Sequence, residues 1–386
     1  MEHRKIRMGM VGGGKDAFIG AVHRIAANMD GQIEFCCAAL SSKPEIARES
    51  GAQLFLPADR IYDSYEQMIR EESKLPADRR IDFVTIVTPN FAHFAPAMMA
   101  LEHGFHVVLE KPMVLSLDEA KQLQAKVEET GLLLCLTHTY SGYPMVKQAR
   151  QMVKDGRFGN IRKIMVEYTQ GWLSTLTEKE GNNGAAWRTD PAKSGKSGAM
   201  GDIGTHAAQL AEYISGLTIT RLCADLNIVV DGRGLDDDGN ILLKFNNGAN
   251  GVLIASQIAA GEENALKIKV YGERGGLEWH QMEPNTLLVK WLDEPVQIYR
   301  AGQAYLSDIA KHNTRVPAGH PEGYLEAFAN IYRNFAATLQ AILAGKTPSA
   351  EMLDFPTVAD GVRGMAFIEN AVASSLSDLK WFDFKI

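Results

Sequence analysis

The first 140 residues alternate short apolar runs with segments of helical periodicity, and this alternation constrains the fold more than any other feature. The run from Ile81 to Pro89 is almost continuously apolar, as in a strand that is buried on both faces. The helical segment that follows Ser116 has Glu119 at the spacing of a capping box and ends at Gly131. Strands that alternate with helices over short connections predict a doubly wound parallel sheet, the Rossmann arrangement.

The rhythm changes after about Tyr140, where longer strand-like segments follow one another directly. Asn247-Gly248 lies between two of these segments and is a hairpin signal. Consecutive strands with tight turns predict a large, open, mostly antiparallel sheet, and helical patterns return at about 322–344 and 356–375. We therefore expect an α/β fold with a Rossmann domain over residues 1–140. An α+β domain for substrate binding and oligomerisation is expected over residues 141–386.

Length and composition narrow the class of protein. The chain has 386 residues, which is long for one core and favours two domains. Its net charge of -7 argues against nucleic acid as a partner, and no apolar stretch reaches the roughly 20 residues that span a bilayer. The first residues lack the pattern of a signal peptide. All four cysteines lie in apolar runs and are expected to be buried thiols of a cytoplasmic protein: Cys36, Cys37, Cys135 and Cys223.

The segment MVGGGKDAFIGAVH, residues 10–23, lies between the first predicted strand and the first predicted helix. Gly12 and Gly14 fit the G-x-G-x-x-G pattern of a dinucleotide-binding turn, in which backbone N–H groups and a helix N-terminus hold a pyrophosphate. The third glycine, Gly20, comes three residues late, close to one helical turn. The residues expected to bind the cofactor here are Gly12, Gly14, Ala17, Phe18 and Ile19. A plain strand-to-helix turn is the alternative.

The second predicted strand ends in Ser41-Ser42-Lys43, at the place where a carboxylate would bind the adenosine ribose of NAD. Two hydroxyls and a lysine tolerate a 2′-phosphate, so the sequence permits NAD or NADP. Ser41 is alternatively a turn or cap before Pro44.

Two further segments carry candidate chemistry. Lys111, in LEKPM at the carboxyl end of a predicted strand, could hold a substrate oxygen and lower its pKa, or could be a surface lysine. Asp202 and His206, in GDIGTH, share a helix face, and the histidine suits proton transfer near neutral pH. The alternative is a helix cap and a packed histidine. No third ligand has motif spacing, so no metal is expected.

In this order and at these separations, the glycine turn, TPNFAH, EKP and GDIGTH resemble the Gfo/Idh/MocA oxidoreductases. The resemblance covers nearly the whole chain. It implies binding of NAD or NADP and oxidation or reduction of a secondary alcohol of a sugar, inositol or related polyol. It also implies that Lys111 is the catalytic lysine, His206 the acid/base and Asp202 its partner. Further cofactor contacts are implied for Thr88, Pro89, Asn90, His93 and Glu110.

Other residues are candidates for substrate binding. Trp187 and Arg188 precede the Asp202 helix, and an aromatic ring can stack on a sugar while arginine binds hydroxyls or an anion. Arg188 could instead pair with Asp190. The remaining candidates are His138 and Tyr140, after the last Rossmann strand, and His320. The acidic run Asp236, Asp237 and Asp238 is expected to be a solvated loop, since EF-hand spacing is absent.

The leading hypothesis is an NAD(P)-dependent dehydrogenase of a sugar or polyol. One alternative is a glycosidase that acts through a transient keto-sugar, and another is a non-catalytic regulator that senses the cofactor or a sugar. An open sheet in the second domain would expose one face and its edges, so we expect a homodimer or homotetramer.

Overall fold

The structure, a computed structural model, describes residues 4–15 and 17–386. The chain divides into two compact units. Unit 1 contains the described residues of Met1–Val114, with Asp118–Thr137 and Phe328–Val362. Unit 2 contains Leu115–Leu117, His138–Ala327 and Arg363–Ile386. The division after residue 140 therefore places Phe328–Val362 differently from the structure, in which this late segment belongs to unit 1.

Unit 1 contains a parallel sheet with the strand order β2-β1-β3-β4-β5 in the described residues. A parallel bridge between Ala38 and Ile61 adds a minimal further strand beyond β2, which gives the Rossmann order. β3 and the last three residues of β4 are fully buried, as the apolar runs predict. The strands are β1 (Ile6–Val11), β2 (Ile33–Ala39), β3 (Phe83–Ile86), β4 (His106–Leu109) and β5 (Leu134–Leu136).

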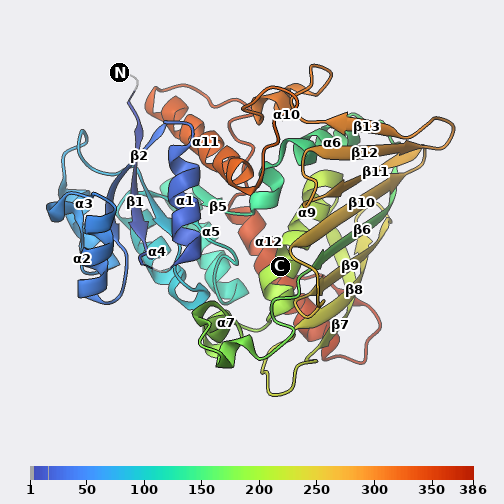
Figure 1. Cartoon of the computed structure of the whole chain (residues 1–386), viewed down its shortest axis with the longest axis horizontal. Coiled ribbons are helices and arrows are strands. Elements are labelled where there is room, and N and C mark those ends of the chain that lie inside the picture. The colour runs from blue at the N-terminus through green and yellow to red at the C-terminus, as the bar shows by residue number, and fades with distance from the viewer. Residues whose placement is uncertain (1–3, 16) are drawn as a thin grey trace. The chain divides into compact units, whose positions relative to one another are not determined.

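Helices flank this sheet, as Figure 1 shows. α1 turns Val22, His23 and Ala26 toward the core and leaves Phe18 exposed. α5 ends before Gly131, whose φ of 66° is the left-handed conformation expected at a helix end. The helices are α1 (Phe18–Asn28), α2 (Pro44–Gln53), α3 (Tyr65–Lys74), α4 (Phe94–Glu102), α5 (Leu117–Thr130) and most of α11 (Tyr324–Leu343), with short 3-10 turns η1 (Ala58–Arg60) and η2 (Asn90–Ala92).

Unit 2 is built on a nine-stranded sheet, counted over the described residues, with the order β13-β12-β11-β10-β6-β9-β8-β7-β14. Its pairs are antiparallel except β6 with β9, which is parallel. Asn247-Gly248 forms the predicted hairpin between β8 and β9, and Gly248 has a φ of 88°. The strands are β6 (Ile161–Thr169), β7 (Ile219–Asn227), β8 (Asp238–Phe245), β9 (Asn250–Ser256), β10 (Ala265–Gly272), β11 (Gly275–His280), β12 (Thr286–Trp291), β13 (Gln297–Arg300) and β14 (Phe382–Asp383).

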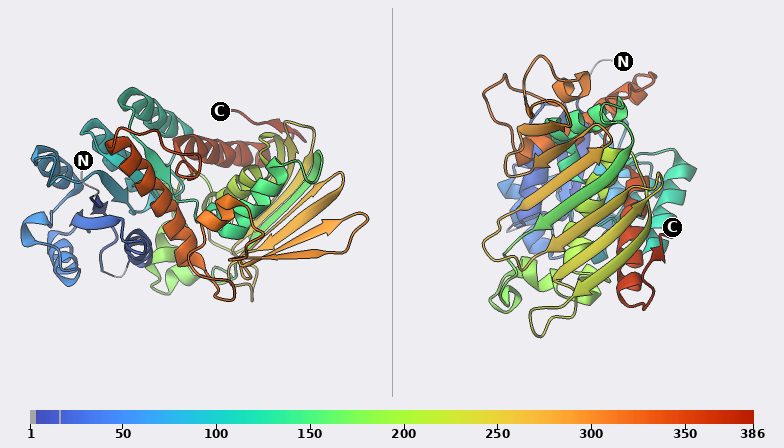
Figure 2. Two further views of the ribbon diagram at one scale, coloured as in Figure 1. Left: turned by 90° about the horizontal axis from the view of Figure 1, so that it is seen from above. Right: turned by 90° about the vertical axis from the view of Figure 1, so that its right-hand side faces the viewer.

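The helices of unit 2 cover one face of this sheet, while its other face is turned to the viewer in Figure 2, right. Along β6, Ile164, Val166 and Tyr168 face the helices and are buried. The helices are α6 (Pro144–Lys154), α7 (Asn183–Arg188), α8 (Pro191–Ser194), α9 (Thr205–Ser215), α10 (Asp308–His312) and most of α12 (Val358–Ser375), with 3-10 turns η3 (Thr139–Gly142) and η4 (Thr177–Lys179) and the π-helix η5 (Met200–Gly204).

Three sequence expectations need correction. The helix that carries Asp202 begins as the π-helix η5 and becomes α-helical only at Thr205, so Asp202 is not an N-cap. The acidic run is not a solvated loop, because Asp236 and Asp237 are buried by backbone amides and Arg233 that bind their carboxylates. Cys37 and Cys135 are buried, but Cys36 and Cys223 are partly exposed because they lie on the less covered sides of their strands.

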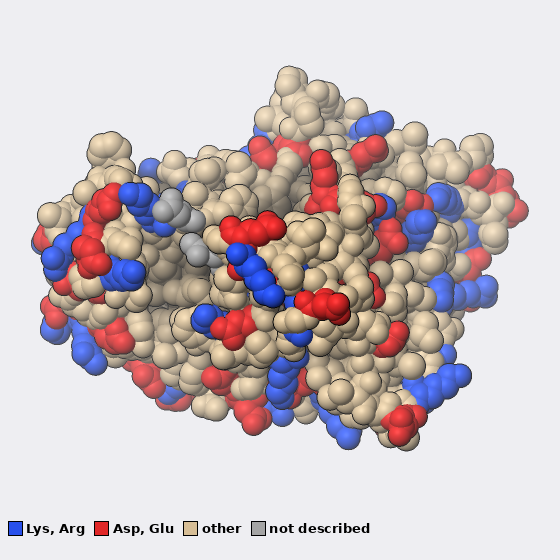
Figure 3. Space-filling view, turned by 60° about the horizontal axis from the view of Figure 1, so that its bottom comes forward, with Lys and Arg blue, Asp and Glu red and all other residues tan. Residues whose placement is uncertain are grey.

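Basic and acidic side chains are interspersed on the face seen in Figure 3. Within residues 4–15 and 17–386, no helix is long and apolar enough to cross a membrane.

Candidate active site

The glycine loop follows β1 directly, at the carboxyl edge of the parallel sheet. Gly12 and Gly13 have φ values of 81° and 75°, which disfavour any side chain. A Cβ atom on Gly20 would lie 2.4 Å from the Cα atom of Gly13. Gly20 therefore packs helix α1 against the loop, as the late third glycine predicts, and its partner is Gly13, which the sequence pattern does not single out.

The loop has the features that a dinucleotide pyrophosphate needs. A hollow of about 420 Å³ is lined by Gly14, Lys15, Ala17 and Phe18 together with residues of α2. Helix α1 begins at Phe18, so its first N–H groups lie at this hollow. Arg24 donates from Nη1 to the Gly13 carbonyl oxygen at 2.7 Å and supports the loop from α1. The residues present fit the phosphate groups of NAD or NADP.

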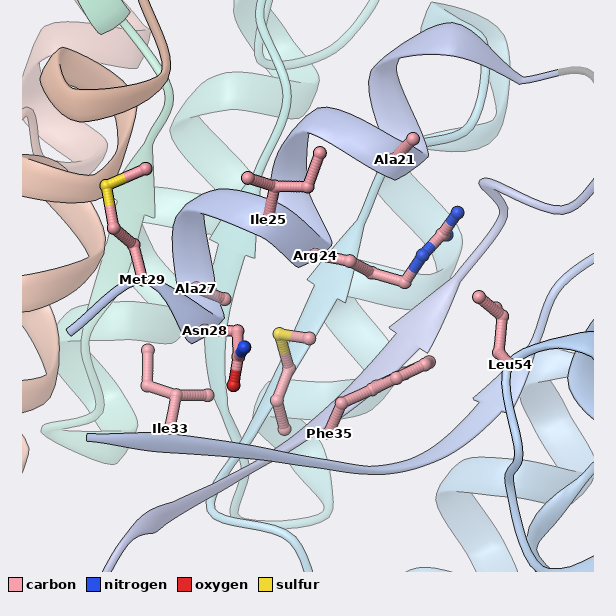
Figure 4. A pocket seen from close by; sticks show the side chains of 10 residues that line it. Ala21, Arg24, Ile25, Ala27, Asn28, Met29, Ile33, Phe35 and Leu54 are labelled. Carbon is pink, nitrogen blue, oxygen red and sulfur yellow. The ribbon is translucent and has the colours of Figure 1, made fainter. Parts of the chain in front are cut away.

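Figure 4 shows a neighbouring hollow of about 640 Å³ between α1 and β2. Ile25 and Met29 of α1, Phe35 of β2 and Leu54 give it an apolar lining, and Arg24 extends along one side. Burial lowers the pKa of Arg24. Its guanidinium therefore connects this apolar hollow with the glycine loop.

The segment after β2 forms a tight turn, in which the Ser41 hydroxyl accepts a hydrogen bond from the Lys43 amide at 3.1 Å. This is the turn that was the alternative for Ser41. Ser42 and Lys43 are exposed. Contact of these three residues with the adenosine ribose stays a prediction.

The Thr88–His93 segment follows β3 at the same edge of the sheet. Pro89 precedes η2, and Asn90 is buried. The ring of His93 reaches two carbonyl oxygens, at 2.8 Å from Nε2 to Thr88 and at 3.0 Å from Nδ1 to Pro112. Burial lowers the pKa of His93, against the two carbonyl groups and Glu110, which raise it. His93 thus joins two loops, and any role in cofactor binding would be indirect.

Glu110 and Lys111 follow β4, and the Glu110 carboxylate is buried in a hydrogen-bond network. Oε1 accepts from His23 Nε2 at 2.9 Å and from the Thr137 hydroxyl at 2.7 Å, while Oε2 accepts from the Lys111 amide at 3.0 Å. Tyr332 of α11 bonds the other ring nitrogen of His23 at 2.6 Å. Burial alone would raise the pKa of Glu110, but His23, Lys111 and Thr137 outweigh it and lower the value to about 2.

In unit 2, the π-helix η5 carries Asp202 and is held by a buried carboxylate. The two oxygens of Asp236 accept from the amides of Gly198 at 2.8 Å and Met200 at 2.9 Å. A Cβ atom on Gly198 would lie 2.2 Å from the Asp236 carbonyl oxygen, so this approach requires glycine. Burial raises the pKa of Asp236 more than the hydrogen bonds from Met200, Ser197 and Gly198 lower it.

Asp202 itself is bound from two sides. Its Oδ2 accepts from Gln257 Nε2 at 2.9 Å and lies 3.3 Å from Arg188 Nε. Arg188 therefore pairs with Asp202, while Asp190 pairs with Lys193. The Arg188 guanidinium also lies 4.3 Å from the Trp187 ring centroid and 5.9 Å from that of Trp172. Carboxylate, guanidinium and indole rings thus lie together at one place in unit 2.

His206, on the first turn of α9, is packed among aromatic rings. Its Nδ1 lies 3.3 Å from Nδ1 of His138, and its ring centroid lies 4.9 Å from that of Tyr140. The hydroxyl groups of Tyr140 and Tyr168 are hydrogen-bonded, and both bond the side chain of Asn264. The structure therefore brings together His138, Tyr140 and His206, three of the candidates from the sequence.

His320 is not part of this cluster as a packed residue, because it is exposed and bonds the Pro317 carbonyl oxygen in its own turn. The sequence analysis missed four polar residues of the cluster in unit 2: Tyr168, Gln170, Gln257 and Asn264. A signal was available for Tyr168, which occupies an inward position of β6 after Ile164 and Val166. Among the residues described, no three His, Cys, Asp or Glu side chains are placed to hold a metal ion.

Comparisons with known proteins agree with both units. Residues 6–138 match the model of an oxidoreductase family with an NAD-binding Rossmann fold, and residues 146–278 match the GFO/IDH/MocA C-terminal domain. An uncharacterized oxidoreductase of Bacillus subtilis (strain 168), YfiI, is 33% identical over 385 residues, which cover 99% of this chain and 98% of that protein.

Solved structures are similar over almost the entire chain. An inositol dehydrogenase homolog from Azotobacter vinelandii, in complex with NAD+, has a TM-score of 0.94 at 35% identity and covers 99% of this chain and 98% of its own. That homolog is also solved with NADH and myo-inositol. An oxidoreductase from Sinorhizobium meliloti has a TM-score of 0.87 at 43% identity over 98% of this chain and 99% of its own. The chain belongs to the Gfo/Idh/MocA oxidoreductase family.

Proposed function

We propose that this protein is an NAD(P)-dependent oxidoreductase that acts on a secondary alcohol of a sugar, inositol or related polyol. The observation that carries the proposal is the occurrence in one chain of a glycine loop fit for a pyrophosphate and a polar, aromatic cluster around His206. The complex of the Azotobacter vinelandii homolog with NADH and myo-inositol supports the same substrate class.

The cofactor would be held by unit 1. The glycine loop and the start of α1 would bind the pyrophosphate, and Ser41, Ser42 and Lys43 would face the adenosine ribose. Because this turn has two hydroxyls and an exposed ammonium in place of a carboxylate, it admits NADP as well as NAD. When bound, the nicotinamide accepts or returns the hydride.

The proton chemistry is assigned to three side chains. Lys111 would donate a hydrogen bond from its ammonium to the substrate oxygen and stabilise negative charge there. His206 would take the hydroxyl proton during oxidation and return it during reduction. Asp202, held by Gln257 and Arg188, would orient the substrate or the histidine.

The surroundings of Asp202 and His206 suit a neutral, hydroxyl-rich substrate. Trp172 and Trp187 offer ring faces on which a sugar or cyclitol can stack, and Gln170 and Gln257 offer amide donors and acceptors. Arg188 is already paired with a carboxylate, so its charge is compensated within the protein. These features favour a neutral polyol over an anionic substrate.

Reduction of NAD and of NADP, measured over a panel of sugars, inositols and sugar phosphates, tests the proposal. A neutral polyol or sugar should give turnover, and Lys111→Ala and His206→Asn should each lower kcat by about 10²- to 10⁴-fold with cofactor binding retained. His320→Asn is the matched control. Turnover that survives both substitutions on the true substrate would show that the assigned roles are wrong.

We also propose a homodimer or homotetramer that forms through the open face of the unit 2 sheet. Cys223, Leu242, Val252 and Met165 are register partners across β7, β8, β9 and β6 and form an apolar row on that face. Leu242 and Met165 are 45% and 42% exposed. Such a row on an uncovered face favours association. A monomeric mass by light scattering at micromolar concentration would contradict this proposal.

A further inference from the structure

The nearest described polar partner of His206 is a second histidine. Nδ1 of His138 lies 3.3 Å from Nδ1 of His206, the rings meet at 85°, and both side chains are buried. His138 follows β5, and His206 lies on α9, so two distant segments of the sequence supply the pair.

This geometry restricts the protonation of both rings. Two facing Nδ1 atoms at hydrogen-bond distance share a single proton, because one must donate and the other must accept. If Nδ1 of His206 carries the proton, its Nε2 atom in the neutral ring carries none and can accept one. If Nδ1 of His138 carries the proton instead, the neutral His206 ring has its own proton on Nε2 and cannot act as a base there.

The first arrangement also stabilises the product of proton transfer. When His206 takes a proton at Nε2, the ring becomes an imidazolium that still donates from Nδ1. The lone pair on Nδ1 of His138 then accepts a hydrogen bond from a charged donor, which is stronger than one from a neutral donor. In a buried site this acceptor offsets part of the desolvation of the charge.

His138 is held firmly enough to serve this purpose. Its carbonyl oxygen accepts from the Ser141 hydroxyl at 2.8 Å within η3. The same turn approaches α11 so closely that a Cβ atom on Gly142 would lie 2.1 Å from the Ala327 carbonyl oxygen. The backbone that carries His138 is thus anchored on both sides of the turn.

The other groups that face His206 come from three elements. Tyr140 of η3 and Tyr168 of β6 pack rings against it, at centroid distances of 4.9 Å and 6.3 Å. Asp202, in η5, lies four residues earlier, and its Oδ2 is bound to Gln257 and Arg188. The Asp202 charge is therefore compensated in part by Arg188, whereas His138 offers a neutral acceptor aligned with the ring.

We infer that His138 is a positioning residue for His206: it selects the tautomer in which Nε2 of His206 can take a proton, and it accepts from Nδ1 of the imidazolium that forms. This inference rests on the proposed function for its catalytic consequence. The hydrogen bond between the rings is independent of any substrate.

The test combines ¹⁵N NMR of the imidazole rings in the full-length chain with steady-state kinetics. His138→Asn retains an amide near the position of Nδ1, His138→Leu removes every polar atom, and His320→Asn is the control on an exposed turn of the same unit. In His138→Leu we expect the His206 signals to shift toward protonation at Nε2. We also expect kcat to fall about 10- to 100-fold with little change in KM.

The pH profile separates positioning from simple packing. Without its acceptor the imidazolium is less stable, so the acid limb of the oxidation rate should move to lower pH in His138→Leu. His138→Asn should restore most of kcat, and NADH binding should stay unchanged in all variants.

Unaltered His206 signals in both His138 variants would overturn the inference. An unmoved acid limb with full kcat in His138→Leu would do the same. If no sugar or polyol is turned over by the natural chain, the proposed function fails, and the NMR comparison alone still decides whether the two rings share one proton.

Discussion

Each unit places a buried carboxylate beneath a proposed catalytic residue, and the two carboxylates behave in opposite ways. In unit 1, Glu110 accepts from the Lys111 amide and has its pKa lowered to about 2. In unit 2, Asp236 accepts from two amides at the start of the segment that carries Asp202, and its pKa is raised. Both side chains organise backbone next to a functional group.

The difference comes from the partners. Glu110 bonds the His23 ring and lies near the Lys111 ammonium, so positive charge offsets its desolvation. Asp236 is bound by backbone amides and Ser197, which supply hydrogen bonds without a full charge. Hydrogen bonds alone therefore do not compensate the burial of Asp236, whereas charged neighbours compensate that of Glu110.

Glu110→Gln should have the largest effect on stability. The substitution removes the charge opposite His23 in a buried site, and breaking such a pair lowers the free energy of unfolding by about 3–5 kcal/mol. Urea unfolding at pH 7 measures the loss. Glu34→Gln, on the exposed side of β2, is the control and should change stability by less than about 0.5 kcal/mol. An equal, small loss in both variants would show that the charge of Glu110 is unimportant.

Asp236→Asn should have an intermediate effect. The amide can accept from only one of the Gly198 and Met200 N–H groups, which costs about 1–2 kcal/mol. Removal of a poorly compensated charge offsets part of this loss. The kcat of the variant should fall because Asp202 is less well held, and a loss of stability as large as that of Glu110→Gln would contradict the contrast.

The pH dependence of the two losses should have opposite signs. The contribution of Glu110 is complete above its ordinary value of 4.5 and is lost as the pH falls toward about 2, so the effect of Glu110→Gln should grow by about 1 kcal/mol from pH 3.5 to 6. The raised pKa of Asp236 means that its ionisation destabilises the fold as the pH rises above 3.8. The effect of Asp236→Asn should therefore shrink over the same range. Parallel trends would refute the comparison.

Lys43→Glu should have the smallest effect on stability, less than about 0.5 kcal/mol, because the residue is exposed. Binding should nevertheless change. A carboxylate in this turn repels a 2′-phosphate, so the dissociation constant of NADPH should rise about 10-fold or more while that of NADH changes little. Fluorescence titration with both cofactors measures the ratio, and an equal change for both would place the ribose elsewhere. Lys74→Glu on α3 is the control.

The sequence predicts the parallel sheet and the glycine loop because their signals are local. Apolar runs mark β1 to β5, and the late Gly20 is explained by its contact with Gly13. The assignment of Phe328–Val362 to unit 1 is not predictable in this way, because helical periodicity does not reveal which sheet a helix covers. The parallel pairing of β6 with β9 is hidden for the same reason.

The candidate site is predicted only in part. Lys111, Asp202 and His206 belong to recognisable segments, and the structure describes each of them. Gln170, Gln257 and Asn264 are single polar residues near strand ends, and only pairing of distant segments brings them to Tyr140 and Asp202. The burial of Asp236 is hidden as well, because three consecutive aspartates are typical of an exposed turn.

The π-helix between Met200 and Gly204 has a consequence for how this chain tolerates changes in length. A π turn holds one residue more than an α turn, so the deletion of one residue there can restore α-helical winding. Each residue removed or added rotates the helix that follows by about 100° relative to the segment before it. A one-residue deletion within 200–204 should therefore leave a folded, fully helical protein in which Asp202 and His206 no longer face the same way. Related chains that differ in length here should differ in chemistry as well.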